Sequence, residues 1–269
     1  MKSMFVGVAI TLALSVVGVG RASEPIRIPP YVATAVADPA RAADAAIDDR
    51  RKVAELTAFA GIKPGDRVLE LIPGSGYFTR VFSKVVGPKG HVYTVWPEPY
   101  EKESTPDSDN LRKLAMQPGY ANISVDIQPA AALKAPEPVN VVFTSQNYHD
   151  YPDKFMGPTD PAILNKAVFA ALKPGGYYII VDHAAEPGSG LRDTDTLHRI
   201  DPEIVKRQVT AAGFEFKGES DVLRNPEDAH AVKVFDKSIR GHTDQFVFKF
   251  RKPKAASAHR RHDNAMRKK

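Results

Sequence analysis

Short segments rich in apolar and β-branched residues alternate with amphipathic segments along most of the chain. The clearest is VNVVFTS at residues 139–145, whose nearly unbroken apolar character is typical of a strand buried on both faces. Between such segments, apolar residues recur at helical spacing, as Phe78, Val81, Phe82 and Val85 do. The alternation predicts an α/β fold with a doubly wound, mostly parallel sheet in a single domain.

The individual elements follow from the same patterns. We predict strands at residues 68–72, 91–96, 123–127, 139–145, 177–182, 214–223 and 245–251, and helices at residues 41–60, 77–86, 109–116, 160–172 and 202–212. The first helix is expected to end at Gly61, a residue that favours a left-handed C-cap. Residues 23–44 are rich in Pro and Ala and are predicted to be an arm that leads into a domain spanning residues 45–251.

The N-terminus has the layout of a secretory signal peptide. Lys2 precedes an apolar run at residues 5–20, and Gly20 and Ala22 place small residues before a cleavage site. We therefore expect residues 1–22 to be cleaved near Ala22 and the protein to be exported to a bacterial periplasm; an uncleaved membrane anchor is the alternative. The chain has no Cys, which is compatible with an oxidising compartment and excludes Cys-based zinc sites.

Charge is distributed unevenly along the chain. The formal net charge is +5, but basic residues gather in KPKAASAHRRHDNAMRKK at residues 252–269, which leaves a mildly acidic body. This tail has few large apolar residues and is predicted to be disordered. We expect it either to contact anionic surfaces or to act as a solubilising tail. The body offers no support for sequence-specific recognition of nucleic acid.

The stretch LELIPGSGYFTR at residues 69–80 has the pattern of a strand end, a glycine turn and the start of a helix. At the carboxyl end of a first strand, Gly74 and Gly76 would let the backbone approach a nucleotide-like ligand. A nicotinamide dinucleotide would require a third glycine where Thr79 stands and an acid at the end of the second strand, where Trp96 stands. The turn therefore argues against a dehydrogenase.

Several segments together resemble the class I S-adenosylmethionine (SAM)-dependent methyltransferases, and most closely the predicted exported bacterial members of unestablished substrate. The resemblance spans about residues 45–250 and rests on GIKPGDRVLELIPGSGYFTR, VYTVW, NYHDY, ALKPGGYYIIVDH and HRIDPEIVKRQVTAAGF. It implies a Rossmann-like sheet of seven strands with an antiparallel last strand. It also implies that SAM is the cofactor and lies across the first two strands.

The resemblance implies a set of cofactor-binding residues. They are Glu70, Pro73, Gly74, Ser75, Gly76, Tyr77, Trp96, Glu98, Asp126, Thr144 and Asn147. Two positions depart from the family pattern, because most relatives have glycine where Ile72 stands and an acidic residue at or beside Trp96. We expect Pro73 to preserve the turn, Glu98 to substitute for the missing acid, and Trp96 to stack on adenine.

The candidate reaction residues follow the fourth predicted strand in QNYHDY, residues 146–151. His149 has a side chain that titrates near neutral pH and is the candidate general base. Asp150 would orient His149, and Tyr148 would hold the substrate. The alternative is that His149 and Asp150 only cap the next segment.

A mixed histidine and carboxylate metal site is a further alternative. His149, Asp150, Asp182 and His183 would supply its ligands. No ligand spacing in the sequence supports such a site, so we expect no metal. For His183 and His198 individually, we favour structural roles.

Two functions of different classes remain open. The leading one is a methyltransferase that uses SAM and acts on a small-molecule or cell-envelope acceptor. Its rival is an exported, non-catalytic binding protein on a methyltransferase scaffold. Ile72, Trp96 and the signal peptide favour the binding protein, whereas the glycine turn, Glu70 and the polar segment 146–151 favour the enzyme.

Overall fold

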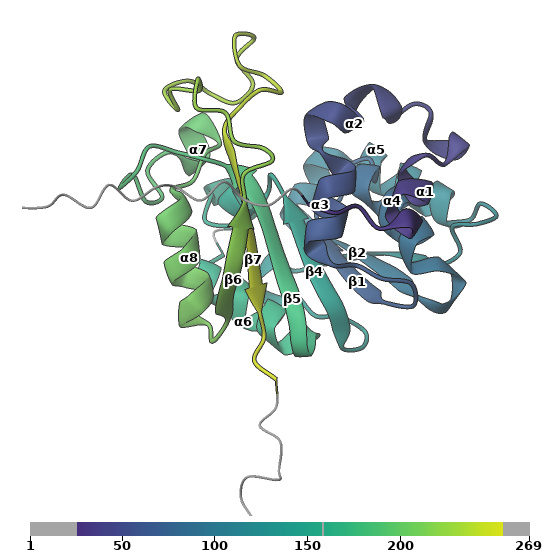
Figure 1. The fold of residues 1–269 in the computed structure, drawn as a ribbon. Coiled ribbons are helices and arrows are strands. Elements are labelled where there is room, and N and C mark those ends of the chain that lie inside the picture. The colour runs from purple at the N-terminus through teal and green to yellow at the C-terminus, as the bar shows by residue number, and fades with distance from the viewer. Residues whose placement is uncertain (1–25, 158, 255–269) are drawn as a thin grey trace, which may run out of the picture.

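A computed structural model describes residues 26–157 and 159–254. At its centre lies a seven-stranded sheet in the order β3-β2-β1-β4-β5-β7-β6 (Figure 1). The strands are β1 Arg67–Leu71, β2 His91–Pro97, β3 Ile123–Gln128, β4 Val139–Ser145, β5 Leu172–His183, β6 Glu215–Ser220 and β7 Gln245–Arg251. Strand β7 runs antiparallel to β5 and β6, and the other paired strands are parallel. The predicted sheet, with its antiparallel last strand, is confirmed.

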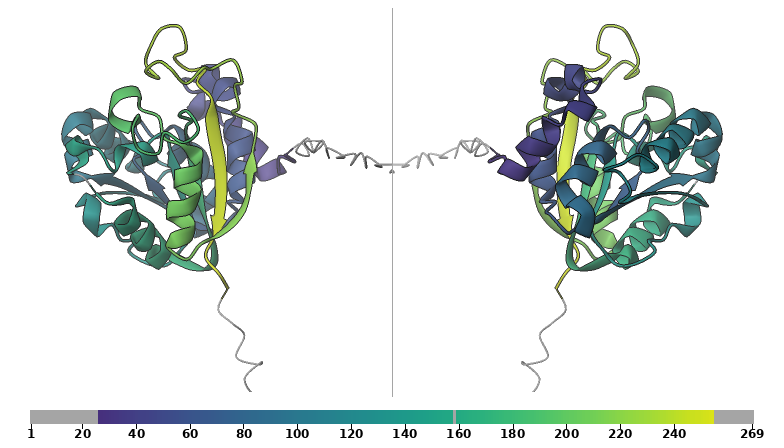
Figure 2. Two further views of the ribbon diagram at one scale, coloured as in Figure 1. Left: turned by 90° about the vertical axis from the view of Figure 1, so that its left-hand side faces the viewer. Right: turned by 90° about the vertical axis from the view of Figure 1, so that its right-hand side faces the viewer.

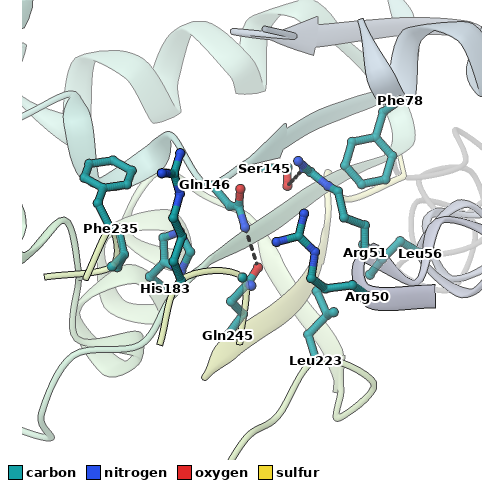
Figure 3. A pocket seen from close by; sticks show the side chains of 13 residues that line it. Arg50, Arg51, Leu56, Phe78, Ser145, Gln146, His183, Leu223, Phe235 and Gln245 are labelled. Carbon is teal, nitrogen blue, oxygen red and sulfur yellow. Dashed lines mark hydrogen bonds between the residues drawn. The ribbon is translucent and has the colours of Figure 1, made fainter. Parts of the chain in front are cut away.

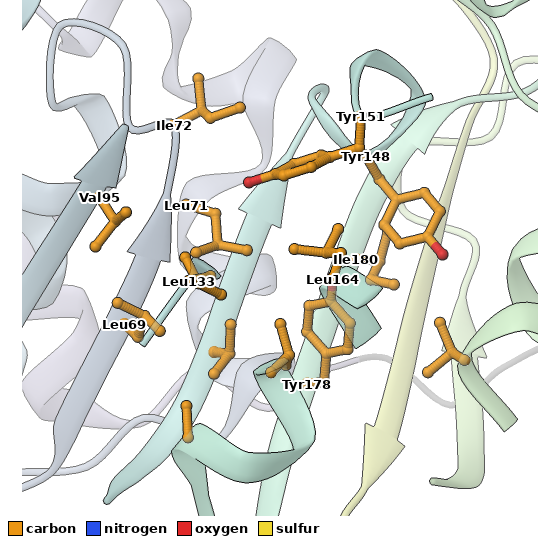
Figure 4. Packing of buried hydrophobic residues seen from close by; sticks show 14 of the residues in the cluster. Leu69, Leu71, Ile72, Val95, Leu133, Tyr148, Tyr151, Leu164, Tyr178 and Ile180 are labelled. Atoms are coloured by element: carbon orange, nitrogen blue, oxygen red, sulfur yellow. The ribbon is translucent and has the colours of Figure 1, made fainter. Parts of the chain in front are cut away.

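Helices cover both faces of the sheet (Figure 2). One face carries α1 Pro30–Val36, α2 Ala45–Arg51, α3 Val53–Ala60 and α4 Tyr77–Val86; the other carries α5 Glu98–Ala115, α6 Pro161–Ala171 and α8 Pro202–Ala211. The short α7, Thr194–Leu197, contacts the turn after β4. Each face has its own apolar core, because successive strand residues point to opposite sides. On β1, Val68 joins the core under α4, whereas Leu69 and Leu71 join the core under α6 (Figure 4).

The N-terminal part differs from the sequence prediction. Residues 30–36 of the predicted arm form α1, whose Val32 is fully buried against the domain. The arm is therefore part of the fold, because its apolar residues complete the core under α3 and α4. The helix predicted over residues 41–60 is broken at Lys52, whose φ of 50° lies in the left-handed region and separates α2 from α3.

The helix predicted at residues 109–116 is the second half of a longer one. Helix α5 begins directly after β2 at Glu98, with Pro99 in its first turn. It bends at Ser104, two residues before Pro106, where the backbone is not helical. This polar first half, which the apolar periodicity does not reveal, passes beside the carboxyl ends of the strands.

The two predicted terminal segments fall largely outside the described residues. This applies to the signal peptide at residues 1–22 and to residues 255–269 of the basic tail. Lys252, predicted as the first tail residue, belongs to the fold, because its ammonium donates to the carbonyl oxygens of Phe169 and Leu172 at 2.7 Å each. Within the described part of the chain, no helix has the length and apolar character required to cross a membrane.

The topology determines where a ligand site is expected. From β1 the chain builds the sheet outward through β2 and β3, and then returns to place β4 on the other side of β1. In open α/β sheets, ligands bind at the carboxyl ends of the strands beside such a reversal. The glycine turn follows β1 and the segment 146–151 follows β4, so both lie at this position.

Candidate active site

A cavity of about 470 Å³ opens at the carboxyl ends of β1 and β4. Its walls come from the end of β1 and the turn after it (Glu70–Ser75), the start of α4, the first half of α5, and the end of β4 with the segment that follows it (residues 145–147, 149 and 150). His183 at the end of β5 and His198 after α7 complete the wall. This volume lies in the range of small-molecule sites.

The turn after β1 keeps a glycine-like backbone without the first glycine. Ile72 has a φ of 50°, in the left-handed region that β-branched residues rarely adopt. Its side chain is buried in the core, and its amide donates to the Val95 carbonyl oxygen at 2.9 Å. The Asn147 amide group donates to the Ile72 carbonyl oxygen at 3.1 Å. Packing and these two hydrogen bonds hold a conformation that costs an isoleucine about 1–2 kcal/mol.

The two glycines of the turn differ in their surroundings. Gly74 has a φ of 55° and lines the cavity, and a Cβ placed on it would meet no atom within 4 Å. Gly76 does not line the cavity, and a Cβ there would come within 2.6 Å of the Leu111 side chain on α5. Gly76 therefore allows close packing between α4 and α5, and it is not placed to contact a ligand.

Glu70 is a buried carboxyl group on the cavity wall, with 2% of its surface exposed. Burial raises its pKa to about 8, although the Thr79 hydroxyl, which donates to Oε2 at 2.6 Å, and the charge of Arg51 act in the opposite direction. Arg51 lies over the rings of Tyr77 and Phe78 and donates to the Ser145 hydroxyl at 3.3 Å. The cavity thus has one titratable acid and one cation near the turn.

The predicted base His149 lies between two carboxylates. Its Nδ1 is 2.7 Å from Asp182 Oδ1, and its Nε2 is 3.1 Å from Asp150 Oδ1. Burial alone would lower the pKa of His149, but Asp182 and Asp150 outweigh it and raise this pKa to about 10. Without another cation at these carboxylates, the raised pKa favours the protonated ring and argues against His149 as a free general base.

Five other predicted residues lie away from the cavity. Tyr148 is buried among α6 and α8, where its hydroxyl donates to Gln208 and accepts from Asn165, so it cannot hold a substrate. Trp96 is fully buried in the core and cannot stack on adenine. The remaining three are Thr144, buried within β4; Asp126, exposed on β3; and Glu98, exposed at the start of α5.

The residues that the structure does bring together at the cavity are Glu70, Pro73, Gly74, Ser75, Tyr77, Asn147, His149 and Asp150. Sequence reasoning missed Arg51 and the α5 residues Tyr100, Glu103 and Ser104, which also line it. The dipeptide Glu98-Pro99 was the available signal, since acids and Pro favour the first turn of a helix. Glu103 is the carboxylate that α5 supplies to the cavity, in place of an acid at the end of β2.

A second cavity, of about 210 Å³, adjoins the first (Figure 3). The residues that line both cavities are Arg51, Phe78, Ser145, Gln146, His183, Val234 and Phe235. Arg50 from α2 and Arg240 from the loop before β7 also line it. Within residues 26–157 and 159–254, no carboxylate forms an ion pair with any of its three guanidinium groups. We call this the arginine cavity; its charge favours an anionic ligand.

The groups around the larger cavity suit the parts of SAM. Glu70 offers a carboxylate for an ammonium group, and Arg51 and the N-terminus of α4 offer cationic and amide groups for a carboxylate. Glu103 would hold the ribose hydroxyls, while Ile72 and Tyr100 supply apolar surface for adenosine. The open space around Gly74 leaves the backbone accessible to a ligand.

Comparisons with known proteins find methyltransferases. The family model for Protein-L-isoaspartate(D-aspartate) O-methyltransferase matches residues 25–157. A protein-L-isoaspartate O-methyltransferase of Methanococcus aeolicus is 31% identical over 156 residues, 57% of this chain and 60% of that protein. A ubiquinone/menaquinone biosynthesis C-methyltransferase UbiE of Vibrio cholerae is 27% identical over 71% of this chain and 63% of that protein. The chain thus spans less than two thirds of the length of the curated relatives that it matches.

Solved structures show the same fold. A SAM-dependent methyltransferase from Aquifex aeolicus superposes with a TM-score of 0.53 at 19% identity, over 82% of this chain and 98% of the other. The chain therefore has the Rossmann-like fold of the class I SAM-dependent methyltransferases, and the comparisons support SAM as its cofactor.

Proposed function

We propose that this protein is a SAM-dependent methyltransferase whose acceptor places a carboxylate or a similar anionic group in the arginine cavity. The observation that carries the proposal is the shared wall of the two cavities: the cavity suited to SAM adjoins one that is lined by three arginines, and this arrangement supports an anionic acceptor. The matching O-methyltransferase family is named for protein L-isoaspartate and D-aspartate, and this name supports a carboxylate acceptor.

A carboxylate acceptor suits the residues at hand. Carboxylates are ionised at neutral pH, so their methylation requires no general base, and the protein has only to position the reactants. SAM, when bound, supplies an electrophilic methyl group on a sulfonium. Arg50 and Arg240 would hold the acceptor, and Gln146, whose amide donates to Gln245 at 3.1 Å, would hold the wall between the two ligands.

The proposal is tested in two stages. Calorimetric titration with SAM and with S-adenosylhomocysteine comes first, and micromolar binding of either is expected. Transfer of labelled methyl groups is then measured with an isoaspartyl peptide, with small dicarboxylic acids and with cell-envelope extract. Binding of SAM without transfer to any acceptor would favour the non-catalytic binding protein.

Arginine variants test the acceptor site. Replacing Arg240 by Ala should raise the acceptor KM about ten- to a hundredfold, because a charge-assisted hydrogen bond is lost, while the SAM Kd stays unchanged. Arg112→Ala, at a partly exposed arginine on α5 paired with Asp109, is the matched control. An unchanged KM in Arg240→Ala would refute this placement of the acceptor.

We also propose that the protein acts outside the cytoplasm, on the basis of the apolar run at residues 5–20. Mass spectrometry of the protein from a fractionated cell should then find a mature N-terminus at Ser23 in the periplasmic fraction. Full-length protein in the cytosol would contradict export.

A further inference from the structure

Three potential metal ligands meet beside the larger cavity. They are His149 Nε2, Asp150 Oδ1 and His198 Nδ1, each on a residue that lines the cavity. His149 Nε2 lies 3.1 Å from Asp150 Oδ1 and 3.4 Å from His198 Nδ1. The third side of the triangle, from His198 Nδ1 to Asp150 Oδ1, is 3.7 Å. His198 is far from the other two residues in the sequence, so the spacing of the three ligands along the chain does not predict that they meet.

The size of this triangle matches the coordination shell of a small divalent metal ion. Zinc binds imidazole nitrogen and carboxylate oxygen at about 2.0–2.2 Å in tetrahedral geometry, which places neighbouring ligand atoms about 3.4 Å apart. The three separations lie on both sides of that value. Two imidazoles and one carboxylate are also a ligand set that zinc and related transition metals favour.

Asp182 contacts the ring nitrogen of His149 that faces away from the proposed metal ligands. Its Oδ1 lies 2.7 Å from His149 Nδ1, so that ring nitrogen carries the proton and Nε2 points toward Asp150 and His198. Asp182 is fully buried and accepts from the backbone amides of His149 at 2.9 Å and His183 at 2.8 Å, which fixes its position. Metal-binding histidines almost always donate their other ring proton to such a carboxylate or carbonyl group.

The other two ligands are also held in place. Asp150 belongs to the short turn Tyr148–Asp150 that follows β4. His198 follows α7 in the left-handed conformation, with a φ of 54°, and its amide donates to the Thr194 carbonyl oxygen at 3.1 Å. Its side chain is 21% exposed, compared with 3% for His149 and 6% for Asp150. An ion would therefore reach the site past His198.

We propose that His149, Asp150 and His198 bind one divalent transition-metal ion, for which zinc is the best match. The protein supplies three ligands, and the remaining position opens into the cavity, where water or an oxygen or sulfur atom of a ligand would fill it. Asp150 and Asp182 together balance the charge of the ion. The ion takes the place of the proton that otherwise joins His149 to Asp150.

The test is titration of the purified protein, without SAM, with Zn²⁺ alone, followed by Co²⁺ as a visible-absorption probe. We expect one equivalent to bind with micromolar or lower Kd, and Co²⁺ to give the intense absorption of a four-coordinate site. His198→Ala and Asp150→Asn should each weaken Zn²⁺ binding at least tenfold. The partial exposure of His198 makes its replacement compatible with folding, and circular dichroism checks both variants.

The matched control is His230→Ala, since His230 also faces a carboxylate, Asp244, at 3.1 Å, but belongs to no group of three potential metal ligands among the residues that the structure describes. His259 and His262 of the tail remain in every variant and add the same background. If Zn²⁺ binds equally to the wild type and to His198→Ala and Asp150→Asn, or does not bind, the proposal is wrong and the group is a proton-bridged ion pair. Because SAM is left out, this result is independent of the proposed methyl transfer.

Discussion

The buried carboxyl group of Glu70 should make the stability of this protein depend on pH in an unusual direction. Burial raises its pKa from 4.5 to about 8 in the folded state. Between these values the folded protein retains a proton that the unfolded chain has released, so stability falls as pH rises from about 4.5 to about 8. At about 1.4 kcal/mol for each tenfold change in proton affinity, the full loss is on the order of 4–5 kcal/mol.

Replacing Glu70 by Gln removes this titration and retains the shape of the side chain. Its amide oxygen can still accept from the Thr79 hydroxyl, which donates to Glu70 Oε2 at 2.6 Å. At pH 5 the variant and the wild type should have similar free energies of unfolding. At pH 8.5 the variant should be more stable by several kcal/mol, although it has lost the carboxylate proposed to hold the SAM ammonium group.

Urea unfolding at pH 5, 6.5 and 8.5 measures the effect, with circular dichroism as the signal. Other titrating groups cancel in the difference between the two proteins, and Glu227→Gln, at an exposed position, is the matched control. A stability difference between Glu70→Gln and wild type that does not change with pH would refute the reasoning. SAM affinity, measured at pH 7, should fall about ten- to a hundredfold in this variant, because a charge-assisted hydrogen bond is lost.

Three further predictions concern the turn and the core. Ile72→Gly should destabilise the protein by about 2 kcal/mol in urea unfolding, because the loss of a buried side chain (about 2–5 kcal/mol) exceeds the relief of left-handed strain (about 1–2 kcal/mol); a more stable variant would contradict this balance. Gly76→Ala should lower the melting temperature more than Gly74→Ala, since only Gly76 faces a side chain at 2.6 Å, and equal effects would refute the packing role. Asp228→Asn should lower the free energy of unfolding in urea by about 3–5 kcal/mol, because it leaves the fully buried Arg199 without its counter-ion. In the wild type, Arg199 Nη1 lies 2.8 Å from Asp228 Oδ2. A decrease below about 1 kcal/mol would show that the ion pair is not essential for stability.

The sheet could be predicted from the sequence because its strands are short apolar runs bounded by turn residues. Residues 139–145 are the clearest case, and β4 has the predicted bounds. The first half of α5 was missed because residues 98–107 are polar and contain two prolines, so they show no apolar face. Helix α5 carries Glu103, which is the carboxylate that this helix contributes to the cavity wall.

The candidate site could be predicted only where its residues lie close together in the chain. Glu70 and Gly74 lie at the end of β1 and in the turn after it, and His149 and Asp150 follow β4, so strand order alone brings them together. His198 reaches the same cavity from about fifty residues further along, through the path of the loop and α7, which no local pattern reveals. The sequence also does not show which way a side chain points. Trp96 and Tyr148 lie near the carboxyl ends of strands, where site residues are expected, yet their side chains are buried in the core.

Arg51 lies on the wall that the two cavities share, so it would link the binding of the two proposed ligands thermodynamically. One guanidinium group cannot neutralise two anionic groups as fully as it neutralises one. An anion in either cavity therefore reduces the attraction that Arg51 offers to an anion in the other. By reciprocity, the factor by which an acceptor changes the affinity for SAM equals the factor by which SAM changes the affinity for that acceptor. With both ligands placed as proposed, replacing Arg51 should therefore change the coupling between their two affinities.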